Sequence, residues 1–344
     1  MRVAIRVDAS LVIGSGHWMR CLTLAKLLQK KESAEIHFIS RDLEGNLHGL
    51  ARGAGFFLHI LPRHRTDSSL GGYAAWLTVT QRRDAEETKA LLQSLGQVDC
   101  LVVDSYAIDI FWERQMRPWT REIFVIDDLA NRKHDCDMLL DQNFYLDMGK
   151  RYEGLVPPHC RMLLGPAHAL LRDEFYEARR RKRTGRLENI LVFYGGSDLT
   201  DETSKAIRAL LEAGIPDLEV NVIVGGKNPQ KEAVRASCRR YASFHYHEQV
   251  SNMAEFMNEA DLMLGAGGTT MWERCFLGLP AIVTAVAENQ VEICRDCSAA
   301  GMIDFLGFYD EVSEEQISRS LQGMTGDQLR NMSAQCMRIF DERP

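Results

Sequence analysis

Short, largely apolar runs alternate with amphipathic stretches along most of the chain. In the first half, the apolar runs cover residues 3–7, 36–39, 56–60, 100–103, 123–126 and 138–140. Two of the intervening stretches, residues 17–28 and 84–95, carry apolar side chains at helical spacing. Apolar runs of four or five residues are typical of strands buried on both faces, and such strands form parallel sheets. The first half is therefore predicted to be an α/β unit built on a parallel sheet.

The second half repeats this pattern. Its predicted strands are residues 190–193, 220–224, 244–246, 262–264 and 281–283, and its predicted helices lie near 200–212, 252–259, 270–277, 291–300 and within 314–340. Both halves open with a strand, a glycine-containing loop and a helix, and doubly wound sheets bind ligands at the carboxyl ends of their strands. The predicted fold class is α/β, with two Rossmann-like doubly wound domains, residues 1–165 and 166–344, facing a central cleft. The last helix is a candidate for packing back on the first domain.

The boundary between the domains is expected between residues 165 and 187. Residues 171–183 are predicted to form a charged helix that ends in the basic run 179–183. We interpret this run as a solvated helix end, because cations are favoured at the carboxyl terminus of a helix. A nucleic-acid-binding tail is the alternative.

Composition and charge narrow the possible functions. The 344 residues carry a net charge of −7, which argues against nucleic acid as the main partner. Nine cysteines at irregular spacing indicate reduced thiols rather than a disulfide framework. The first residues lack the apolar core of a signal peptide, and no apolar run approaches the ~20 residues of a membrane helix. We therefore expect a cytoplasmic protein without a membrane partner, and a monomer is the default expectation.

The loop after the first predicted strand carries the main candidates for chemistry. His17 follows Gly14, Ser15 and Gly16 at the expected start of a helix, and the two glycines allow the backbone to approach a substrate closely. At that position the helix dipole favours a neutral imidazole, which can act as a general base toward water.

Asp8 is a candidate for orienting the His17 ring. Candidate contacts for the substrate or UDP are Gly14, Ser15, Gly16 and Arg20. The alternative is that His17 only caps its helix and packs.

A second glycine-rich segment lies near residue 267. The strand 262–264 runs into Gly267 and Gly268, and Thr269 and Thr270 open the next helix. Free backbone N–H groups and the positive end of a helix make such a turn an anion site. No lysine follows the glycines, so the segment is not a Walker loop.

Two further segments are candidates for nucleotide contacts. Glu288 is a candidate acceptor for ribose hydroxyls, and Asn289 and Gln290 are candidates for the phosphate or the sugar, in a loop after the strand 281–283. An ordinary helix start is the alternative for these three residues. Gly196, in a glycine turn after the strand 190–193, either contacts phosphate or packs at a tight turn.

Taken together, these motifs resemble one family. The segments RVDAS, IGSGH and MRC near the start, and GAGGTTMWERCFLGLPAIV and AENQ near the end, are similar to the UDP-sugar hydrolase of pseudaminic acid biosynthesis and its spore-coat polysaccharide relatives. Residues 103–106, 126–128, 152–157 and 171–175 also resemble that family.

The resemblance implies a GT-B architecture related to the peptidoglycan transferase MurG. It also implies hydrolysis of UDP-2,4-diacetamido-2,4,6-trideoxy-β-L-altropyranose to UDP and the free sugar, with inversion at the anomeric carbon. His17 then matches the base, and Tyr106 and Asn289 match positions that line the sugar and phosphate region. Tyr106 is therefore a further candidate catalytic residue. The family needs no metal and no cofactor.

One segment departs from the resemblance. Residues 61–81 form a longer polar insertion than the family pattern needs, and this insertion either contacts substrate or lies on the surface without a role.

Two other functions remain open. An inverting UDP-sugar glycosyltransferase of MurG-like type would use the same scaffold, with His17 activating an acceptor hydroxyl. A non-catalytic nucleotide-sugar binding protein would hold its ligand intact.

Overall fold

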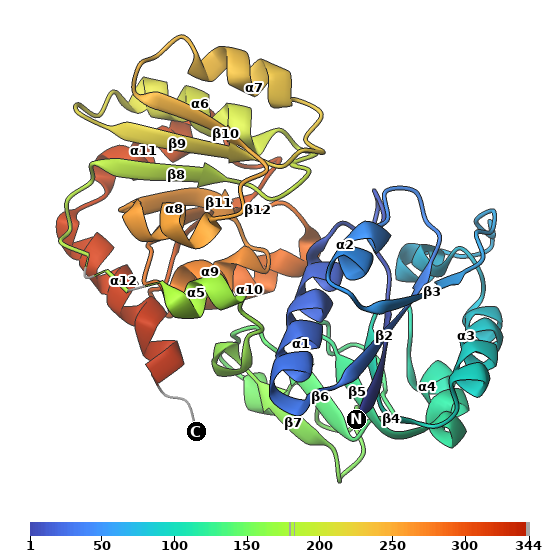
Figure 1. The fold of residues 1–344 in the computed structure, drawn as a ribbon. Coiled ribbons are helices and arrows are strands. Elements are labelled where there is room, and N and C mark those ends of the chain that lie inside the picture. Colours follow the sequence, from blue (N-terminus) through green and yellow to red (C-terminus); the bar gives the residue numbers. More distant parts are fainter. Residues whose placement is uncertain (179, 182, 342–344) are drawn as a thin grey trace. The chain divides into compact units, whose positions relative to one another are not determined.

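The chain folds into two compact units, which Figure 1 shows as a ribbon. The computed structural model describes residues 1–178, 180–181 and 183–341. Unit 1 comprises Met1–Asn143 and Asp147–Leu170, and unit 2 comprises Phe144–Leu146 and Leu171–Pro344.

Unit 1 is built on a seven-stranded sheet of order β3-β2-β1-β4-β5-β6-β7. Every neighbouring pair of these strands is parallel, which confirms the prediction from the apolar runs. The strands are β1 Arg2–Val7, β2 Glu35–Arg41, β3 Phe57–Leu61, β4 Val98–Asp104, β5 Thr120–Ile126, β6 Met138–Asp141 and β7 Arg161–Leu164.

Helices cover both faces of this sheet, because alternate residues of each strand feed two separate apolar cores. In β1, Val3 and Ile5 pack in the core that includes α1, whereas Ala4 packs in the core that includes α3 and α4. The α-helices are α1 Gly16–Glu32, α2 His48–Gly53, α3 Gln81–Leu95 and α4 Ile110–Met116, and the short 3₁₀ helices are η1 Gly72–Leu77, η2 Arg117–Trp119, η3 Met148–Lys150 and η4 Pro166–His168.

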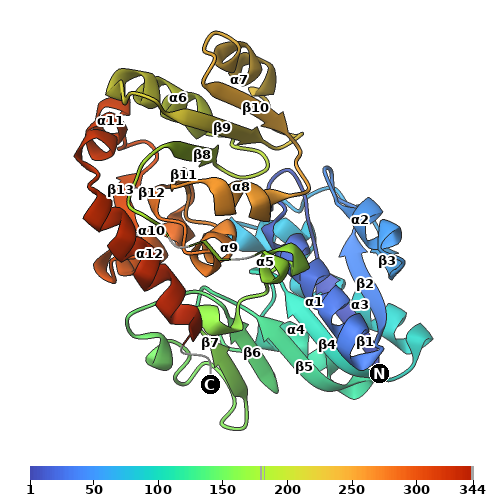
Figure 2. The same cartoon turned by 60° about the vertical axis from the view of Figure 1, so that its left-hand side comes forward.

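Unit 2 repeats the architecture with a six-stranded parallel sheet of order β10-β9-β8-β11-β12-β13. Its strands are β8 Asn189–Phe193, β9 Glu219–Val224, β10 Phe244–Glu248, β11 Leu262–Ala266, β12 Ala281–Ala285 and β13 Asp304–Phe308. Its helices are α5 Asp173–Glu177, α6 Glu202–Ala213, α7 Lys231–Cys238, α8 Met253–Glu259, α9 Thr270–Phe276, α10 Glu288–Ala299, α11 Glu314–Gly323 and α12 Gly326–Asp341. Figure 2 shows α6 and α11 side by side over this sheet. The last helix, α12, contacts its own unit, where Cys336 donates to the carbonyl of Met302.

The charge pattern predicted that the basic run 179–183 is the solvated end of a long helix. This prediction is wrong for the residues of the run that the structure describes. Helix α5 ends at Glu177. Arg183 is buried, and its guanidinium donates to the backbone carbonyls of Met257, Asn258 and Ala260 at the end of α8. The carboxyl end of a helix leaves such carbonyls without partners, and a buried guanidinium supplies the missing donors. Residues 179 and 182 lie outside the described part of the chain.

No helix in the described ranges combines the length and the apolar character that crossing a membrane requires.

Candidate active site

Aspartates gather at the carboxyl ends of adjacent strands in unit 1. Parallel strands place these ends at one edge of the sheet, where doubly wound folds bind ligands. Helix α1 starts after the loop that leaves β1 at the same edge. The aspartates that end or directly follow β1, β4, β5 and β6 are Asp8, Asp104, Asp127, Asp128 and Asp141.

His17, the second residue of α1, is held by one of these carboxylates. Its Nδ1 lies 2.6 Å from Oδ1 of Asp104, and both side chains are buried. An ionised carboxylate only accepts hydrogen bonds, so this contact assigns the proton to Nδ1. Nη2 of Arg20 also lies 3.0 Å from Nδ1, but a guanidinium only donates, and Nη2 donates to Oδ1 of Asp104 at 2.6 Å. Within the described residues, no hydrogen bond is made through Nε2 of His17. Nε2 therefore keeps its lone pair and is the atom that can accept a proton.

Arg20, one turn further along α1, fixes the same carboxylate. Its Nε and Nη2 donate to the two oxygens of Asp104, each at 2.6 Å, and its Nη1 donates to Asp128 at 3.0 Å. Burial alone would raise the pKa of the Asp104 carboxyl, but the charges of Arg20 and His17 hold that pKa well below its usual range. Asp104 therefore stays ionised and can stabilise an imidazolium at His17. The predicted contact of Arg20 with substrate stays a prediction, since the described contacts make it a support for Asp104.

Tyr106 lies beside His17. The two rings meet edge to face, with their centroids 4.6 Å apart and an angle of 83°. The Tyr106 hydroxyl donates to Asp128. Burial, and next the charge of Asp128, raise the pKa of Tyr106 well above its usual value, so the hydroxyl keeps its proton. Its catalytic role stays a prediction.

The carboxylate that orients His17 is Asp104, and not Asp8, the partner predicted from the sequence. Oδ1 of Asp8 accepts from the backbone N–H of Arg41 at 2.7 Å and pairs with Arg6 at 2.7 Å. Arg41 ends β2, and β2 lies on the side of β1 opposite to β4, which carries Asp104. Asp8 is therefore turned away from His17 and anchors the start of the loop.

The loop between β1 and α1 closes on itself as a tight turn. The N–H of Gly14 donates to the carbonyl of Ser10 at 2.9 Å, and Gly14 has φ of +79°, a conformation that favours glycine. Ser15 is exposed at the N-cap of α1, and Gly16 opens the helix. The predicted substrate contacts of these three residues stay predictions.

The insertion 61–81 brings two aromatic rings to the site. Trp76, on η1, lies with its ring centroid 5.4 Å from Tyr106 and 5.8 Å from His17. Tyr73, one turn earlier on η1, lies 5.0 Å from Tyr106. Sequence patterns did not identify these residues as site residues, although aromatic side chains in an otherwise polar insertion were a signal.

The charged groups of the site pair with one another. Asp127 pairs with Arg132 at 2.7 Å, and Asp141 lies 3.6 Å from Arg151. Among the residues that the structure describes, no three His, Cys, Asp or Glu side chains are arranged to hold a metal ion.

Asp141 should make the stability of the protein depend on pH. Burial raises the pKa of its carboxyl to about 8, and the charge of Asp128 adds to the rise. An unfolded aspartate has a pKa of about 3.9, so between about pH 4 and pH 8 the folded state binds more protons than the unfolded state. We expect the free energy of unfolding in urea to fall as pH rises through this window, and Asp141→Asn to flatten the fall.

The exposed Asp147 offers a matched control, since its side chain is 71% exposed. Asp147→Asn should keep the wild-type pH dependence. An Asp141→Asn protein whose stability falls as steeply as that of the wild type would contradict this assignment.

In unit 2, the glycine turn between β11 and α9 packs closely against α10. A Cβ added at Gly267 would lie 2.3 Å from Sγ of Cys294 and 3.3 Å from Cβ of Gln290. Gly268 is partly buried, Thr269 is exposed, and Thr270 opens α9. The turn therefore lies beside the first turns of both α9 and α10, and helix starts supply backbone N–H donors for anions.

Glu288, Asn289 and Gln290 form the first turn of α10 rather than the loop predicted for them. The helix begins because Ala287 has extended backbone as the N-cap, and the Gln290 side chain accepts from the N–H of Val286 at 3.0 Å. Gln290 lies against the glycine turn, and Glu288 is exposed. The alternative of an ordinary helix start is thus correct for the backbone, while the proposed nucleotide contacts stay predictions.

Gly196 takes part in close backbone packing. A Cβ added at Gly225 would lie 2.0 Å from the carbonyl oxygen of Gly196, so the two turns after β8 and β9 touch through their backbones. Nearby, Asp198 accepts hydrogen bonds from the N–H groups of Glu202 and Thr203 and caps α6. These contacts favour packing for Gly196, and its role toward phosphate stays a prediction.

Replacing Gly267 with alanine tests the close packing of the glycine turn. The new Cβ would meet the Cys294 sulfur, and overpacking of this kind costs about 1–3 kcal/mol of unfolding free energy. We expect Gly267→Ala to lower the melting temperature of the protein in scanning calorimetry. Cys294→Ala removes the clashing sulfur, so the double variant should recover part of the loss. Equal losses in the single and double variants would contradict this prediction.

Most of unit 2 matches the model of a known domain family. The model of the glycosyltransferase family 28 C-terminal domain matches residues 190–331. Among solved structures, MurG of Acinetobacter baumannii is 14% identical, with a TM-score of 0.66 over 98% of this chain and 94% of that chain. A Phytolacca americana protein, UGT2, solved with UDP-2-fluoro-glucose and pterostilbene, is 13% identical, with a TM-score of 0.71 over 99% of this chain and 94% of that chain. These likenesses confirm the predicted α/β fold of GT-B type.

Three curated proteins resemble the chain in sequence. The UDP-2,4-diacetamido-2,4,6-trideoxy-β-L-altropyranose hydrolase of Campylobacter jejuni is 24% identical over 84% of this chain and 93% of its own length. Spore coat polysaccharide biosynthesis protein SpsG of Bacillus subtilis is 29% identical over 47% of this chain and 48% of its own length. An uncharacterized protein of Methanocaldococcus jannaschii is 25% identical over 86% of this chain.

The chain spans 57% of the archaeal protein and about half of SpsG, but nearly all of the Campylobacter hydrolase. The chain is therefore similar over most of its length to the Campylobacter altropyranose hydrolase and over about half of it to SpsG, and it has the GT-B fold.

Proposed function

We propose that this protein is a UDP-sugar hydrolase of pseudaminic acid biosynthesis. It releases UDP from UDP-2,4-diacetamido-2,4,6-trideoxy-β-L-altropyranose by attack of water at the anomeric carbon, with inversion. The observation that carries the proposal is the buried His17–Asp104 pair at 2.6 Å, which presents Nε2 as a base. The substrate is that of the Campylobacter relative, and it comes to this chain by that relationship alone.

The chemistry assigns one role to each member of the pair. Nε2 of His17 takes a proton from water while the water oxygen forms a bond to the anomeric carbon. The bond from that carbon to the phosphate oxygen breaks, its electron pair stays on UDP, and the configuration inverts. Asp104 stabilises the imidazolium that forms and keeps the ring in the right tautomer. Arg20 keeps Asp104 ionised.

Unit 2 supplies the proposed UDP site. The Gly267–Gly268 turn lies beside the first turns of two helices, and N–H groups at helix starts bind diphosphate without a metal ion. Glu288, exposed at the start of α10, is the proposed partner of the ribose hydroxyls, and Asn289 and Gln290 are proposed to contact the phosphate or the sugar.

The second candidate is an inverting glycosyltransferase, which the family 28 match of unit 2 favours. In that reaction Nε2 of His17 would deprotonate an acceptor hydroxyl instead of water. The two candidates therefore share every residue described above and differ only in the nucleophile.

Incubation with the UDP-sugar in EDTA, without any acceptor, separates the candidates. We expect proton NMR to show release of UDP and a free sugar that first appears as the inverted anomer. Intact substrate that nonetheless raises the melting temperature of the protein would overturn the hydrolase and favour the transferase or a binding protein. Absence of binding would overturn the proposed substrate.

A further inference from the structure

Four rings form one aromatic cluster in unit 1, and two of them come from the insertion 61–81. Trp76 stacks on Tyr106 at an interplanar angle of 29°, and it meets His17 edge to face at 77°. Tyr73 meets Trp76 and Tyr106 edge to face, with centroid distances of 4.9 and 5.0 Å. Trp76 and Tyr73 are three residues apart on a 3₁₀ helix, which has three residues per turn, so they share one face. Both side chains are only partly buried.

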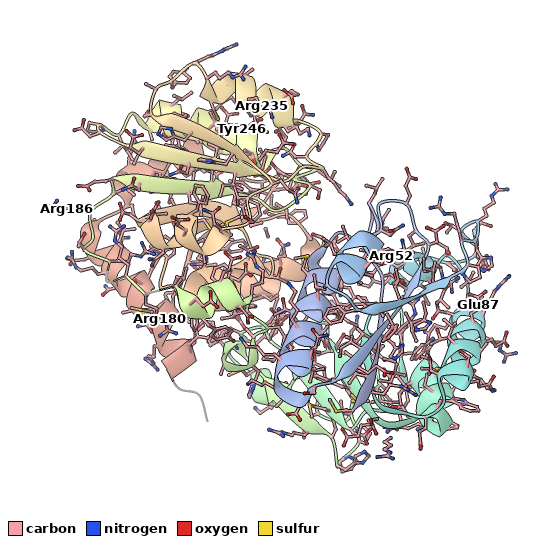
Figure 3. The ribbon with its side chains drawn as sticks, in the orientation of Figure 1. Arg52, Glu87, Arg180, Arg186, Arg235 and Tyr246 are labelled. Atoms are coloured by element: carbon pink, nitrogen blue, oxygen red, sulfur yellow. The ribbon has the colours of Figure 1, made fainter. Side chains whose placement is uncertain are left out.

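The insertion is held in place by buried side chains at both of its ends. Arg41, which is fully buried, donates to the carbonyl of Pro62 at 2.8 Å and to Asp84 at 2.7 Å. Glu87, labelled on α3 in Figure 3, pairs with Arg41 at 2.7 Å and with His64 at 2.8 Å. The same charged groups thus fix the start of the insertion and the helix that follows it.

The middle of the insertion is closed by its own hydrogen bond and by apolar anchors. The N–H of Asp67 donates to the carbonyl of Thr78 at 3.0 Å. On either side of Thr78, Leu77 and Val79 are 1% and 5% exposed and belong to the core around α3 and α4. The rings of Trp76 and Tyr73 are therefore held by a built element and not by a loose loop.

Aromatic rings beside His17 should favour the apolar groups of a sugar over its hydroxyl groups. Ring faces bury C–H and methyl groups well, whereas a hydroxyl turned toward them loses its hydrogen bonds to water. A 6-deoxy sugar with acetamido groups at C2 and C4 offers three methyl groups, which are C6 itself and the methyl group of each acetyl. A sugar with a hydroxyl at C6 offers fewer methyl groups and one more polar group.

Resting on the proposed function, we infer that Trp76 and Tyr73 contact the sugar and select 6-deoxy, N-acetylated sugars over sugars with a hydroxyl at C6. The insertion 61–81 is thus the specificity element of unit 1, separate from the His17–Asp104 pair that acts on water. A hydroxyl added to a substrate in an apolar pocket changes kcat/KM by about 10²-fold, so the effect is large enough to measure.

The test compares two substrates in matched variants. These are UDP-2,4-diacetamido-2,4,6-trideoxy-β-L-altropyranose and its analogue with a hydroxyl at C6. In the wild type, we expect kcat/KM to favour the 6-deoxy substrate by about tenfold or more. Trp76→Ala and Tyr73→Ala should each reduce this ratio toward one, mainly by raising KM for the 6-deoxy substrate. Trp76→Phe keeps a ring and should keep most of the ratio.

Phe111→Ala is the matched control, because Phe111 is an exposed aromatic residue of unit 1 outside the ring cluster. It should leave the ratio unchanged. A variant that only destabilises the fold lowers both kcat/KM values together, and the melting temperature reports that loss. If Trp76→Ala does not fold, the ratio of the two kcat/KM values in Tyr73→Ala and Trp76→Phe still tests the inference. A wild-type ratio kept in both alanine variants would overturn the inference.

Saturation-transfer NMR on the free 2,4-diacetamido-2,4,6-trideoxy sugar separates this inference from the proposed function. The methyl protons should receive saturation from the wild type and lose it in Trp76→Ala and Tyr73→Ala. A wild type that releases no UDP but shows this pattern would refute the hydrolase and support the aromatic contact. Methyl signals equal in the wild type and in both variants would refute the contact whether or not UDP is released.

Discussion

Replacing His17 with asparagine is expected to lower kcat for UDP release by about 10²- to 10⁴-fold, the usual contribution of a general base. Asparagine can still accept a hydrogen bond, but it cannot take a proton from water at neutral pH. The proposed UDP contacts lie in unit 2, so the affinity for UDP should stay close to that of the wild type. Steady-state kinetics and calorimetry with UDP measure the two quantities separately.

His159→Asn is the control for this substitution. Its side chain is 62% exposed in unit 1, so its loss should change neither kcat nor UDP affinity. Turnover by the His17→Asn protein at a rate comparable to that of the wild type would remove His17 as the base. A parallel loss of UDP affinity would show instead that the substitution disturbs more than the chemical step.

Asp104→Asn should impair both catalysis and stability. An amide oxygen can accept from Nδ1–H, but an amide N–H can also donate to Nδ1 and hold the ring in the wrong tautomer, which in a comparable triad costs about 10⁴-fold in kcat. The substitution also removes the carboxylate that accepts from Nε and Nη2 of the buried Arg20 guanidinium. Breaking a buried ion pair from one side costs about 3–5 kcal/mol of unfolding free energy.

The stability part of this prediction depends on pH in a defined direction. The folded pKa of Asp104 is lowered, so the stability it contributes is fully present above the unfolded pKa of about 3.9 and is lost as pH falls toward the folded value. The difference in unfolding free energy between wild type and Asp104→Asn should therefore be constant from neutral pH down to about pH 4 and shrink below it. Urea unfolding over this range measures the difference. A stable variant with wild-type kcat would refute the role of Asp104.

The parts of the site that depend on local sequence could be predicted, because a strand, a glycine loop and a helix start follow one another within a few residues. This holds for His17 and for the Gly267–Gly268 turn. Asp104 lies 87 positions from His17, and only the strand order brings it there. Residue 104 directly follows a predicted strand, so placing β4 beside β1, as doubly wound sheets often do, was the signal that would have found it.

Other features were harder to predict from the sequence. Asp8 and Asp104 both end strands next to the His17 loop, and only the side chain directions show that Asp8 turns to β2. Trp76 and Tyr73 lie in a segment without apolar periodicity, and their place beside Tyr106 depends on the buried Arg41, which ties down both ends of the insertion. Arg183 looked like one of five solvated cations, because charge patterns do not reveal which helix end lies within reach.

The hydrogen bond between Asp67 and Thr78, which closes the insertion, has a consequence for how related proteins can diverge. Because the Asp67–Thr78 hydrogen bond and the Arg41 contacts fix both ends, residues 68–76 form a loop whose contents can change while its anchors stay. Exchange of this loop between relatives would replace the ring surface and leave the sheet and the proton acceptor untouched. From the inferred contact of Trp76 and Tyr73 with the sugar, we expect a graft of this loop to change the substrate preference.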